Sequence, residues 1–297
     1  MATAFCPAHI TGFFKAELDN KDSKQLGSLG AGFSIQKGVK TTVTVRKKTK
    51  HDISNFTIKV NGFESGDMRV SEVVLSKFST EEKYVDVIHE INVPVGYGFG
   101  SSAAVALSLS IALNDALECK LSKIEVAQIA HDVEIECKTG LGDVLASYYG
   151  GFEIRDKPGA PGVGHVEKIN LDKISIIMIC FSPISTNKFI KERLPQINGL
   201  GGKMVNKLLE SKNYEHFQEM SLEFAKYVDV MTPRMQKVVN ELSKNNIKCG
   251  IALFGETIFS MIPEKSEKKV LEILEKYSDG IIIKSELDNA GARVLYN

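Results

Sequence analysis

At 297 residues the chain can bury a substantial core and is close to the size at which one core divides into two, which predicts two domains. Its 37 basic and 37 acidic residues balance, so nothing in the composition attracts nucleic acid or an anionic membrane, and any anion site must be local. Five cysteines without C-x-x-C spacing support neither a disulfide framework nor a zinc site. The longest apolar segment, 174–181, is too short to span a bilayer. We therefore expect a cytoplasmic protein.

Several segments in the first half of the chain alternate β-branched with polar residues between Gly, Asn and Asp, which predicts strands. These strands are expected at 2–13, 33–47, 53–61 and 84–93. Helices are expected at 71–79, 102–118 and 123–138. The last of these helices follows Ser122, with Glu125 three residues further on, which is the pattern of a capping box.

A Gly- and Pro-rich run at 157–164 marks the expected boundary between two domains, 1–165 and 166–297. Beyond it we expect strands at 174–181, 280–285 and 291–296, a hairpin around 255–256, and helices at 185–194, 200–211, 213–230, 234–245 and 266–277. The mixed order of strands and helices, with antiparallel pairing, favours an α+β fold over a doubly wound parallel sheet.

The most informative segment is 94–104, in which glycines at alternate positions lead through two serines into an apolar helix. Glycines at this spacing let the backbone approach an anion closely, so that successive N–H groups point at phosphate oxygens. The helix that follows adds the partial positive charge of its N-terminus. The segment lacks the Lys of a Walker loop and the GxGxxG of a dinucleotide fold, so neither of those sites is indicated.

This segment resembles the P-x3-G-x-G-S-S-A-A signature of the GHMP kinases, a superfamily of small-molecule kinases. The resemblance implies ATP as phosphoryl donor. It also implies a two-domain fold, with a mixed β/α N-terminal domain of the ribosomal-S5-domain-2-like type and a ferredoxin-like C-terminal domain. In that family the loop wraps the ATP phosphates and its second serine contacts magnesium. By position, the expected nucleotide-binding residues are Pro94, Gly96, Gly98, Gly100, Ser101, Ser102 and Ala103.

A second group of polar residues lies on the helix expected at 123–138, where His131, Glu134 and Lys138 share a face with Ala127. Taken alone, Glu134 and Lys138 could be an ordinary surface pair. The downstream segment 140–151, however, resembles the G-x-D motif of the GHMP kinases. The resemblance implies that Glu134 and Ser102 hold Mg²⁺, a hard cation that also accepts phosphate oxygens.

The same motif implies that Asp143 is the catalytic base that removes the proton of the acceptor alcohol. Homoserine kinases of this superfamily lack this Asp, so its alternative role is to orient the alcohol. Phosphoryl transfer depends mostly on positioning and charge neutralisation, which one hydroxyl and two carboxylates can provide.

Within the superfamily, segments 5–14 and 27–32 and the two motifs above resemble the archaeal kinases that phosphorylate pantoate in coenzyme A biosynthesis. That resemblance implies pantoate as the small-molecule substrate. The expected substrate-binding residues are Ser28, His131, Arg155 and His9. Each has a structural alternative. Ser28 could be a turn residue and His131 the partner of a backbone carbonyl. Arg155 could belong to a surface ion pair, and His9 could be a packed strand residue. His9, where the family usually has Lys or Arg, could also neutralise Asp143.

Two other functions stay open at this level. A related kinase could act on another small hydroxy acid or alcohol, as homoserine and mevalonate kinases do. A non-catalytic metabolite sensor could also use this scaffold, because folds do not fix functions, although the presence of Ser102, Glu134 and Asp143 together argues against it. A homodimer is possible, since dimers are the commonest assembly. No nucleic-acid or membrane partner is expected.

Overall fold

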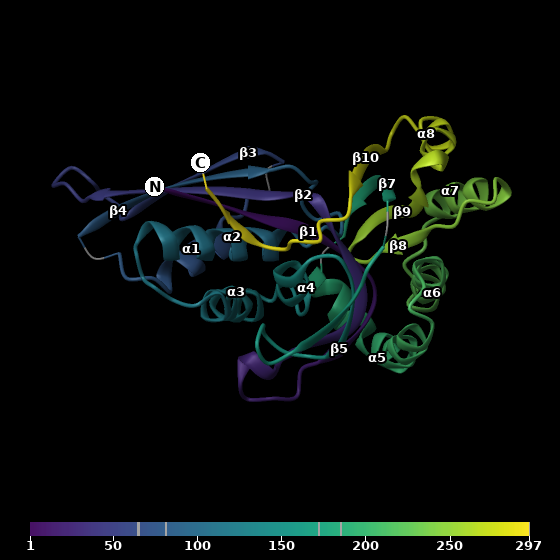
Figure 1. The fold of residues 1–297 in the computed structure, drawn as a ribbon, viewed down its shortest axis with the longest axis horizontal. Helices are drawn as coiled ribbons and strands as arrows, with labels where there is room; N and C mark the ends of the chain where they lie inside the picture. The colour runs from purple at the N-terminus through teal and green to yellow at the C-terminus, as the bar shows by residue number, and fades with distance from the viewer. Residues whose placement is uncertain (64–65, 81, 172, 185, 297) are drawn as a thin grey trace.

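The computed structural model describes residues 1–63, 66–80, 82–171, 173–184 and 186–296. The chain forms two β-sheets that lie toward opposite ends of an elongated molecule, each with its own helices (Figure 1). This mixed, largely antiparallel arrangement is the expected α+β fold.

The first sheet is built on β1 and β2, two long antiparallel strands. Its path runs β11-β1-β2-β4-β3, and β5 and β6 extend it from β2. The strands are β1 (Ala2–Glu17), β2 (Gly27–Lys47), β3 (Phe56–Gly62), β4 (Lys83–Ile91), β5 (Phe152–Lys157), β6 (His165–Ile169) and β11 (Arg293–Leu295). The pairing of β1 shifts register at Pro7/Ala8 and again at Thr11/Phe13, and such irregularities bend a strand. His9 and Thr11 lie within this bent stretch.

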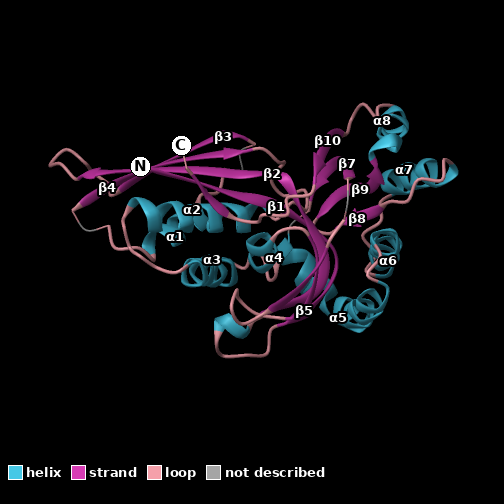
Figure 2. Cartoon of the chain, viewed as in Figure 1, coloured by secondary structure: helices cyan, strands magenta, loops and turns pink. Residues whose placement is uncertain are grey.

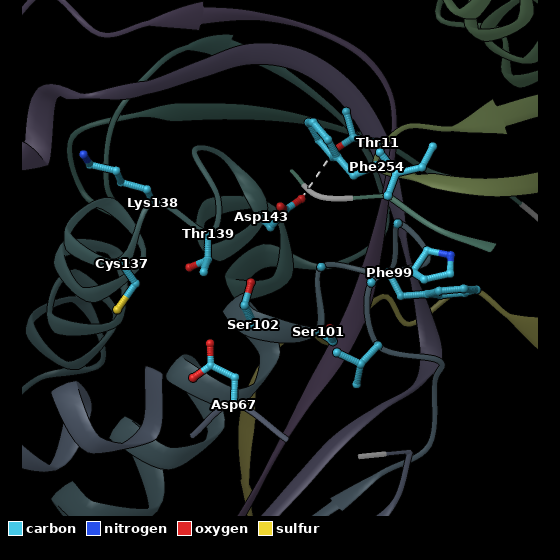
Figure 3. Close-up of a pocket in the computed structure, with 16 residues that line it drawn as sticks. Thr11, Asp67, Phe99, Ser101, Ser102, Cys137, Lys138, Thr139, Asp143 and Phe254 are labelled. Atoms are coloured by element: carbon cyan, nitrogen blue, oxygen red, sulfur yellow. Dashed lines mark hydrogen bonds between the residues drawn. The ribbon is translucent and has the colours of Figure 1, made fainter. Parts of the chain in front are cut away.

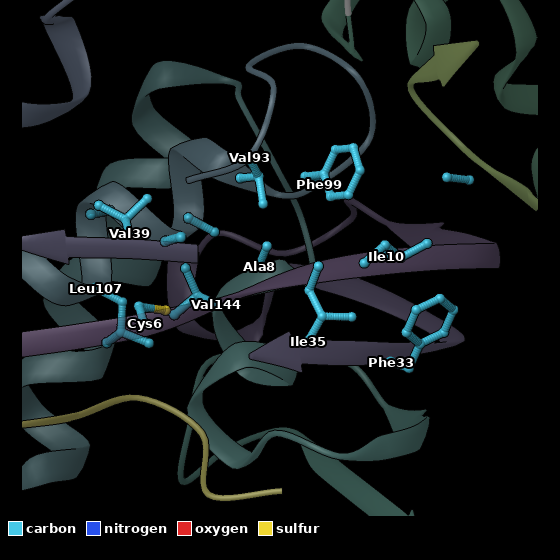
Figure 4. Close-up of a cluster of buried hydrophobic side chains, with 14 of the residues drawn as sticks. Cys6, Ala8, Ile10, Phe33, Ile35, Val39, Val93, Phe99, Leu107 and Val144 are labelled. Carbon is cyan, nitrogen blue, oxygen red and sulfur yellow. The ribbon is translucent and has the colours of Figure 1, made fainter. Parts of the chain in front are cut away.

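Helices cover one face of the first sheet (Figure 2). They are α1 (Arg69–Ser76), α2 (Ser101–Ala116), α3 (Lys123–Cys137) and α4 (Asp143–Tyr149). Small apolar residues let α2 lie close to the sheet, where Leu107 packs in a buried cluster with Cys6, Ala8 and Val144 (Figure 4). A short 3₁₀ turn, Ser23–Gln25, joins β1 to β2.

The second sheet has the strand order β10-β7-β9-β8, with antiparallel pairing throughout. Its strands are β7 (Ile174–Pro183), β8 (Gly250–Ala252), β9 (Gly255–Pro263) and β10 (Ile281–Glu286). The helices of this half are α5 (Thr186–Ser211), α6 (Tyr214–Tyr227), α7 (Pro233–Lys244) and α8 (Glu267–Leu274), the last preceded by a 3₁₀ turn at Glu264–Ser266. Among the described residues, no helix combines the length and apolar character needed to cross a membrane.

Most expected elements are confirmed within a few residues, including the capping box, in which Ser122 and Glu125 bond each other's backbone N–H groups. Three features were not predicted: α4, β5 and β6. The glycines at 27–32 are not a loop but the start of β2, paired with the end of β1. Sheet pairing also crosses the expected boundary at 165, because β6 and β11 both join the first sheet. The division into domains 1–165 and 166–297 therefore stays a prediction.

The helices expected at 185–194 and 200–211 form one helix, α5, which contains Pro195. Residue 185 lies outside the described part of the chain. Gly199, Gly201 and Gly202 do not break this helix. A Cβ at Gly201 would lie 1.9 Å from the carbonyl oxygen of Phe14, so this glycine lets α5 pack directly against β1.

Candidate active site

The Gly-rich segment forms the loop between β4 and α2. Gly96, Gly98 and Gly100 all have positive φ, at 84°, 86° and 55°, which glycine adopts without strain. A Cβ at Gly98 would also lie 2.4 Å from the carbonyl oxygen of Leu253, so the loop approaches the second sheet closely there. Gly100 is the N-cap of α2 and has no side chain to cap the helix, which leaves the first N–H groups of α2 for an anion.

A cavity of about 650 Å³ opens in front of this loop (Figure 3). Its walls come from both halves of the chain: Thr11, Asp67, Val95, Gly96, Gly98, Phe99, Gly100, Ser101, Ser102, Cys137, Lys138, Thr139, Asp143, Pro183, Ile184 and Phe254. An apolar cavity of about 170 Å³ adjoins it, with Asp67, Val95 and Ser102 in both linings. The volume and the Gly-rich wall suit a phosphorylated ligand of nucleotide size.

The side chains of Pro94 and Ala103 do not line the large cavity, although both were expected at the nucleotide site. Both residues are buried, Ala103 completely, because it faces the sheet from the first turn of α2. Only their backbone can therefore contact a ligand, whereas Ser101 and Ser102 present side chains to the cavity.

Glu134 is 2 % exposed, so it is not the surface partner of Lys138. Its Oε1 accepts a hydrogen bond of 2.5 Å from the Thr139 hydroxyl, while Oε2 is buried without a hydrogen-bond partner among the described residues. Burial raises the pKa of Glu134 to about 7, and the neighbouring charge of Asp143 acts in the same direction. A buried carboxylate oxygen without a hydrogen-bond partner is stabilised when it binds a proton or a cation.

The carboxylates of Glu134 and Asp143 approach each other at Gly140. A Cβ there would lie 2.2 Å from Glu134 Oε2 and 3.3 Å from Asp143 Oδ2, so the absence of a side chain at this position lets both oxygens lie close to the backbone. Among the described residues, no three His, Cys, Asp or Glu side chains gather closely enough to hold a metal alone. The donor set thus fits a hard divalent cation that brings phosphate oxygens and water as its other ligands.

Asp143 is the first residue of α4 and faces the large cavity. Its Oδ1 accepts a hydrogen bond of 2.8 Å from His9 Nδ1 and a longer one of 3.4 Å from the Thr11 hydroxyl. Burial alone would raise the pKa of Asp143, but the bond and the charge of His9 outweigh it and hold that pKa below its ordinary value. Asp143 is therefore a carboxylate at neutral pH, able to accept a proton.

Arg155 and Ser28 line a smaller cavity next to the large one, which shares Thr11, Asp143 and Phe254 with it. Arg155 is 1 % exposed, and its Nε has no partner among the described residues. A Cβ at Gly142 would lie 2.3 Å from Ser28 Oγ and 2.9 Å from Arg155 Nε. Ser28 and Arg155 therefore pack closely against Gly142, where a side chain would collide with both.

His131 lies apart from this group, and its expected role in substrate binding stays a prediction. Its Nε2 lies 3.1 Å from the carbonyl oxygens of both Ser23 and Leu26, and burial lowers its pKa. A neutral ring therefore ties α3 to the turn after β1. Of the four expected substrate-binding residues, the structure brings Ser28, Arg155 and His9 to Asp143, but not His131.

Glu153 was missed by sequence analysis. It is fully buried, and its Oε1 lies 2.7 Å from His9 Nε2 and 2.5 Å from Arg155 Nη1. The available signal was alternation, because residues 153 and 155 share one face once a strand is recognised there. Thr139 was also missed, and no pattern in the sequence marks it.

The comparisons with known proteins agree with this geometry. The sequence model of the GHMP kinases N terminal domain matches residues 68–151. A pantoate kinase of Methanocaldococcus jannaschii is 32% identical over 276 residues, covering 91% of this chain and 96% of the relative. A pantoate kinase of Thermococcus kodakarensis is 26% identical, with 91% of each chain covered.

Solved structures with the same fold include other small-molecule phosphotransferases. A phosphotransferase related to the CoA biosynthesis pathway superposes with a TM-score of 0.88 at 26% identity, covering 98% of this chain and 97% of the other. The homoserine kinase of Cytophaga hutchinsonii shares the fold, with a TM-score of 0.66 at 18% identity over 99% and 97% of the two chains. Fold and cavity thus define a phosphotransferase with an alcohol acceptor. The chain belongs to the GHMP kinase superfamily, and its curated relatives here are archaeal pantoate kinases.

Proposed function

We propose that this protein transfers the γ-phosphoryl group of ATP to the primary hydroxyl of pantoate, giving 4-phosphopantoate. The observation that carries the proposal is the buried Arg155 guanidinium, which lines the small cavity beside Asp143 and whose Nε has no hydrogen-bond partner among the described residues. Pantoate has a carboxylate at one end and the reacting hydroxyl at the other. Pantoate kinases are also the chain's curated relatives.

The residues that line the small cavity offer groups that suit the rest of this acceptor. Arg155 and Ser28 can bind the carboxylate, while Phe14, Ile190 and Phe254 offer apolar surface to the two methyl groups of pantoate. The cavity holds only about 10 Å³, room for about one water, so the acceptor extends from it into the large cavity. Homoserine would bring an ammonium group close to Arg155 and to these apolar walls, which disfavours it.

The nucleotide phosphates would lie against the loop at Gly96–Gly100 and the N-terminus of α2, with the base in the adjoining apolar cavity. Ser102 and Glu134 would hold Mg²⁺, which when bound neutralises charge on the transferred phosphoryl group. A solved structure with this fold, at a TM-score of 0.72 and 14% identity, was determined with AMPPCP and magnesium.

Asp143 would accept the proton of the acceptor hydroxyl. His9 and Thr11 hold its Oδ1, which leaves Oδ2 for the alcohol. Because the first turn of α4 fixes the Asp143 backbone and His9 fixes its side chain, the carboxylate needs little reorganisation before the proton moves.

The test is ADP release by the purified protein with ATP and Mg²⁺, using pantoate, homoserine, mevalonate, glycerate or no acceptor, with the product mass checked. We expect turnover on pantoate with one phosphate added. Turnover on another acceptor alone would contradict the choice of pantoate. ATP binding without turnover on any acceptor would favour the alternative function, a non-catalytic metabolite sensor.

Arg155→Ala is expected to raise the KM for pantoate far more than the KM for ATP. It removes the carboxylate partner, and a hydrogen bond to a charged group contributes about 1.5–3 kcal/mol, or roughly 10- to 100-fold. Steady-state kinetics with each substrate varied in turn measures the two constants. Equal increases in both would indicate that Arg155 only stabilises the fold.

Two glycine substitutions should separate the acceptor site from the nucleotide site. Gly142→Ala places a methyl group too close to Ser28 Oγ and Arg155 Nε and would displace both side chains, so we expect a higher KM for pantoate and an unchanged KM for ATP. Gly98→Ala strains a backbone at φ 86° by about 1–3 kcal/mol and crowds Leu253, so we expect weaker ATP binding. Each variant is the control for the other, and the same effect from both would contradict the assignment of two sites.

A further inference from the structure

We infer that Glu153 is a positioning residue. Its carboxylate holds His9 as a doubly protonated imidazolium against Asp143 and fixes which edge of Arg155 faces the acceptor. Glu153 does not line the described cavities, so it acts through His9 and Arg155 and not on the substrate itself. The role in acceptor binding rests on the proposed function, whereas the charge state of His9 does not.

The protonation of His9 follows from its two contacts. Nδ1 lies 2.8 Å from Asp143 Oδ1, and Nε2 lies 2.7 Å from Glu153 Oε1. A neutral imidazole has one N–H, so one of these contacts would set a lone pair against a carboxylate oxygen. The His9 side chain is 0% exposed, so water cannot relieve that repulsion. With Glu153 ionised, two N–H donors, and hence a positive ring, satisfy both contacts. Arg155 Nη1 also lies 3.3 Å from His9 Nε2, but it donates its shorter hydrogen bond, of 2.5 Å, to Glu153 Oε1.

With a protonated His9, the charges of the cluster balance when Glu153 is ionised. Asp143 faces the ring from α4, while Glu153 and Arg155 face it from β5, and the neutral Thr11 hydroxyl lies nearby on β1. With His9 protonated, two positive and two negative groups share one buried cluster. Burial lowers the pKa of His9, but its bonds to the two carboxylates outweigh burial and raise that pKa above its ordinary value. Without the charge of Glu153, two buried cations would face Asp143 alone, which favours loss of the His9 proton.

Glu153 also orients the guanidinium. Arg155 Nη1 donates to Glu153 Oε1, and Nη2 makes only a 3.5 Å contact with the Thr11 hydroxyl. Nε has no hydrogen-bond partner among the described residues, so the Nε and Nη2 edge is the one that would bind a carboxylate through two parallel hydrogen bonds. An Arg155 freed from Glu153 could turn this edge away from the acceptor.

Strand β2 has glycines where the cluster needs space. Gly30 pairs with Arg155 and Gly32 pairs with Glu153 across the β2–β5 ladder. A Cβ at Gly32 would lie 2.5 Å from His9 Nε2, and one at Gly30 would lie 2.7 Å from Arg155 Nη2. Two glycines of segment 27–32 thus let the side chains of the ion cluster lie close to β2, and they do not form a turn.

The experiment is ¹⁵N NMR of histidine-labelled protein, with the His9 signals assigned by their loss in His9→Gln. In the unchanged protein we expect both His9 ring nitrogens to be protonated at pH 8. In Glu153→Gln we expect a neutral ring at that pH, because the proton is lost at lower pH once one carboxylate is gone. Glu153→Asp, which keeps the charge, should restore part of the protonation.

Glu256→Gln is the matched control. Glu256 is also a buried glutamate bonded to an arginine, Arg234, but it lies in the second sheet, so this variant should leave the His9 signals unchanged. In kinetics, Glu153→Gln should lower kcat/KM for pantoate by about 10²-fold through misplacement of Arg155, with the KM for ATP unchanged.

A neutral His9 in the unchanged protein at pH 7 would overturn the inference, even if Glu153→Gln did not fold. So would a doubly protonated His9 in Glu153→Gln at pH 8. The NMR result does not depend on the acceptor, so failure of pantoate as substrate would leave this test standing.

Discussion

Asp143→Asn is expected to lower kcat by about 10²- to 10⁴-fold, because an amide cannot accept the proton of the acceptor alcohol. Asn has almost the same shape as Asp, and its carbonyl oxygen can still accept the hydrogen bond from His9 Nδ1. The fold and ATP binding should therefore persist. Stopped-time assays of ADP release at saturating ATP and pantoate measure the effect, and a nucleotide-binding titration verifies the site.

Asp132→Asn is the control for this substitution. Asp132 lies on α3 and accepts a hydrogen bond of 2.6 Å from Ser23, outside the large cavity. It should retain normal turnover. If Asp143→Asn lost less than about tenfold in kcat, Asp143 would orient the alcohol without accepting its proton.

Glu134→Gln is expected to lower turnover by about 10²-fold and to raise the Mg²⁺ concentration needed for half-maximal activity. A metal ion contributes several kcal/mol of charge stabilisation in phosphoryl transfer, and each 1.36 kcal/mol is a factor of about ten. The neutral amide loses the charge that attracts the cation but keeps the size of the side chain. The measurement is turnover as a function of Mg²⁺ at fixed ATP, alongside ATP binding without metal, which should be unchanged.

Glu136→Gln supplies the comparison on the same helix. Glu136 is exposed and pairs with Lys77, so its loss should leave the Mg²⁺ requirement as it is. An unchanged Mg²⁺ requirement in Glu134→Gln would show that Glu134 is not a metal ligand and that its buried carboxylate has a structural role.

Local patterns in the sequence were enough for the parts of the site that lie close together along the chain. The spacing at 94–104 predicted a loop that leads into a helix, and Ser122 with Glu125 predicted where α3 begins. Helical periodicity placed Glu134 and His131 on one face. In these segments the backbone and the nearest neighbours decide the conformation, so the order of the residues is sufficient.

The contacts between distant segments required the tertiary structure. His9 and Asp143 are 134 positions apart in sequence, and His9 and Glu153 are 144 apart. Sequence analysis missed Glu153, because β5 is short and pairs with β2 from far away in the chain.

The sequence by itself therefore determined the α+β class, the Gly-rich loop before α2 and the polar residues available on α3. Only the tertiary structure decided that His9 lies between two carboxylates and that Arg155 lines a small cavity beside Asp143. The physical reason is that such ion clusters depend on the register between strands and on the packing of helices over them. Local propensity encodes neither.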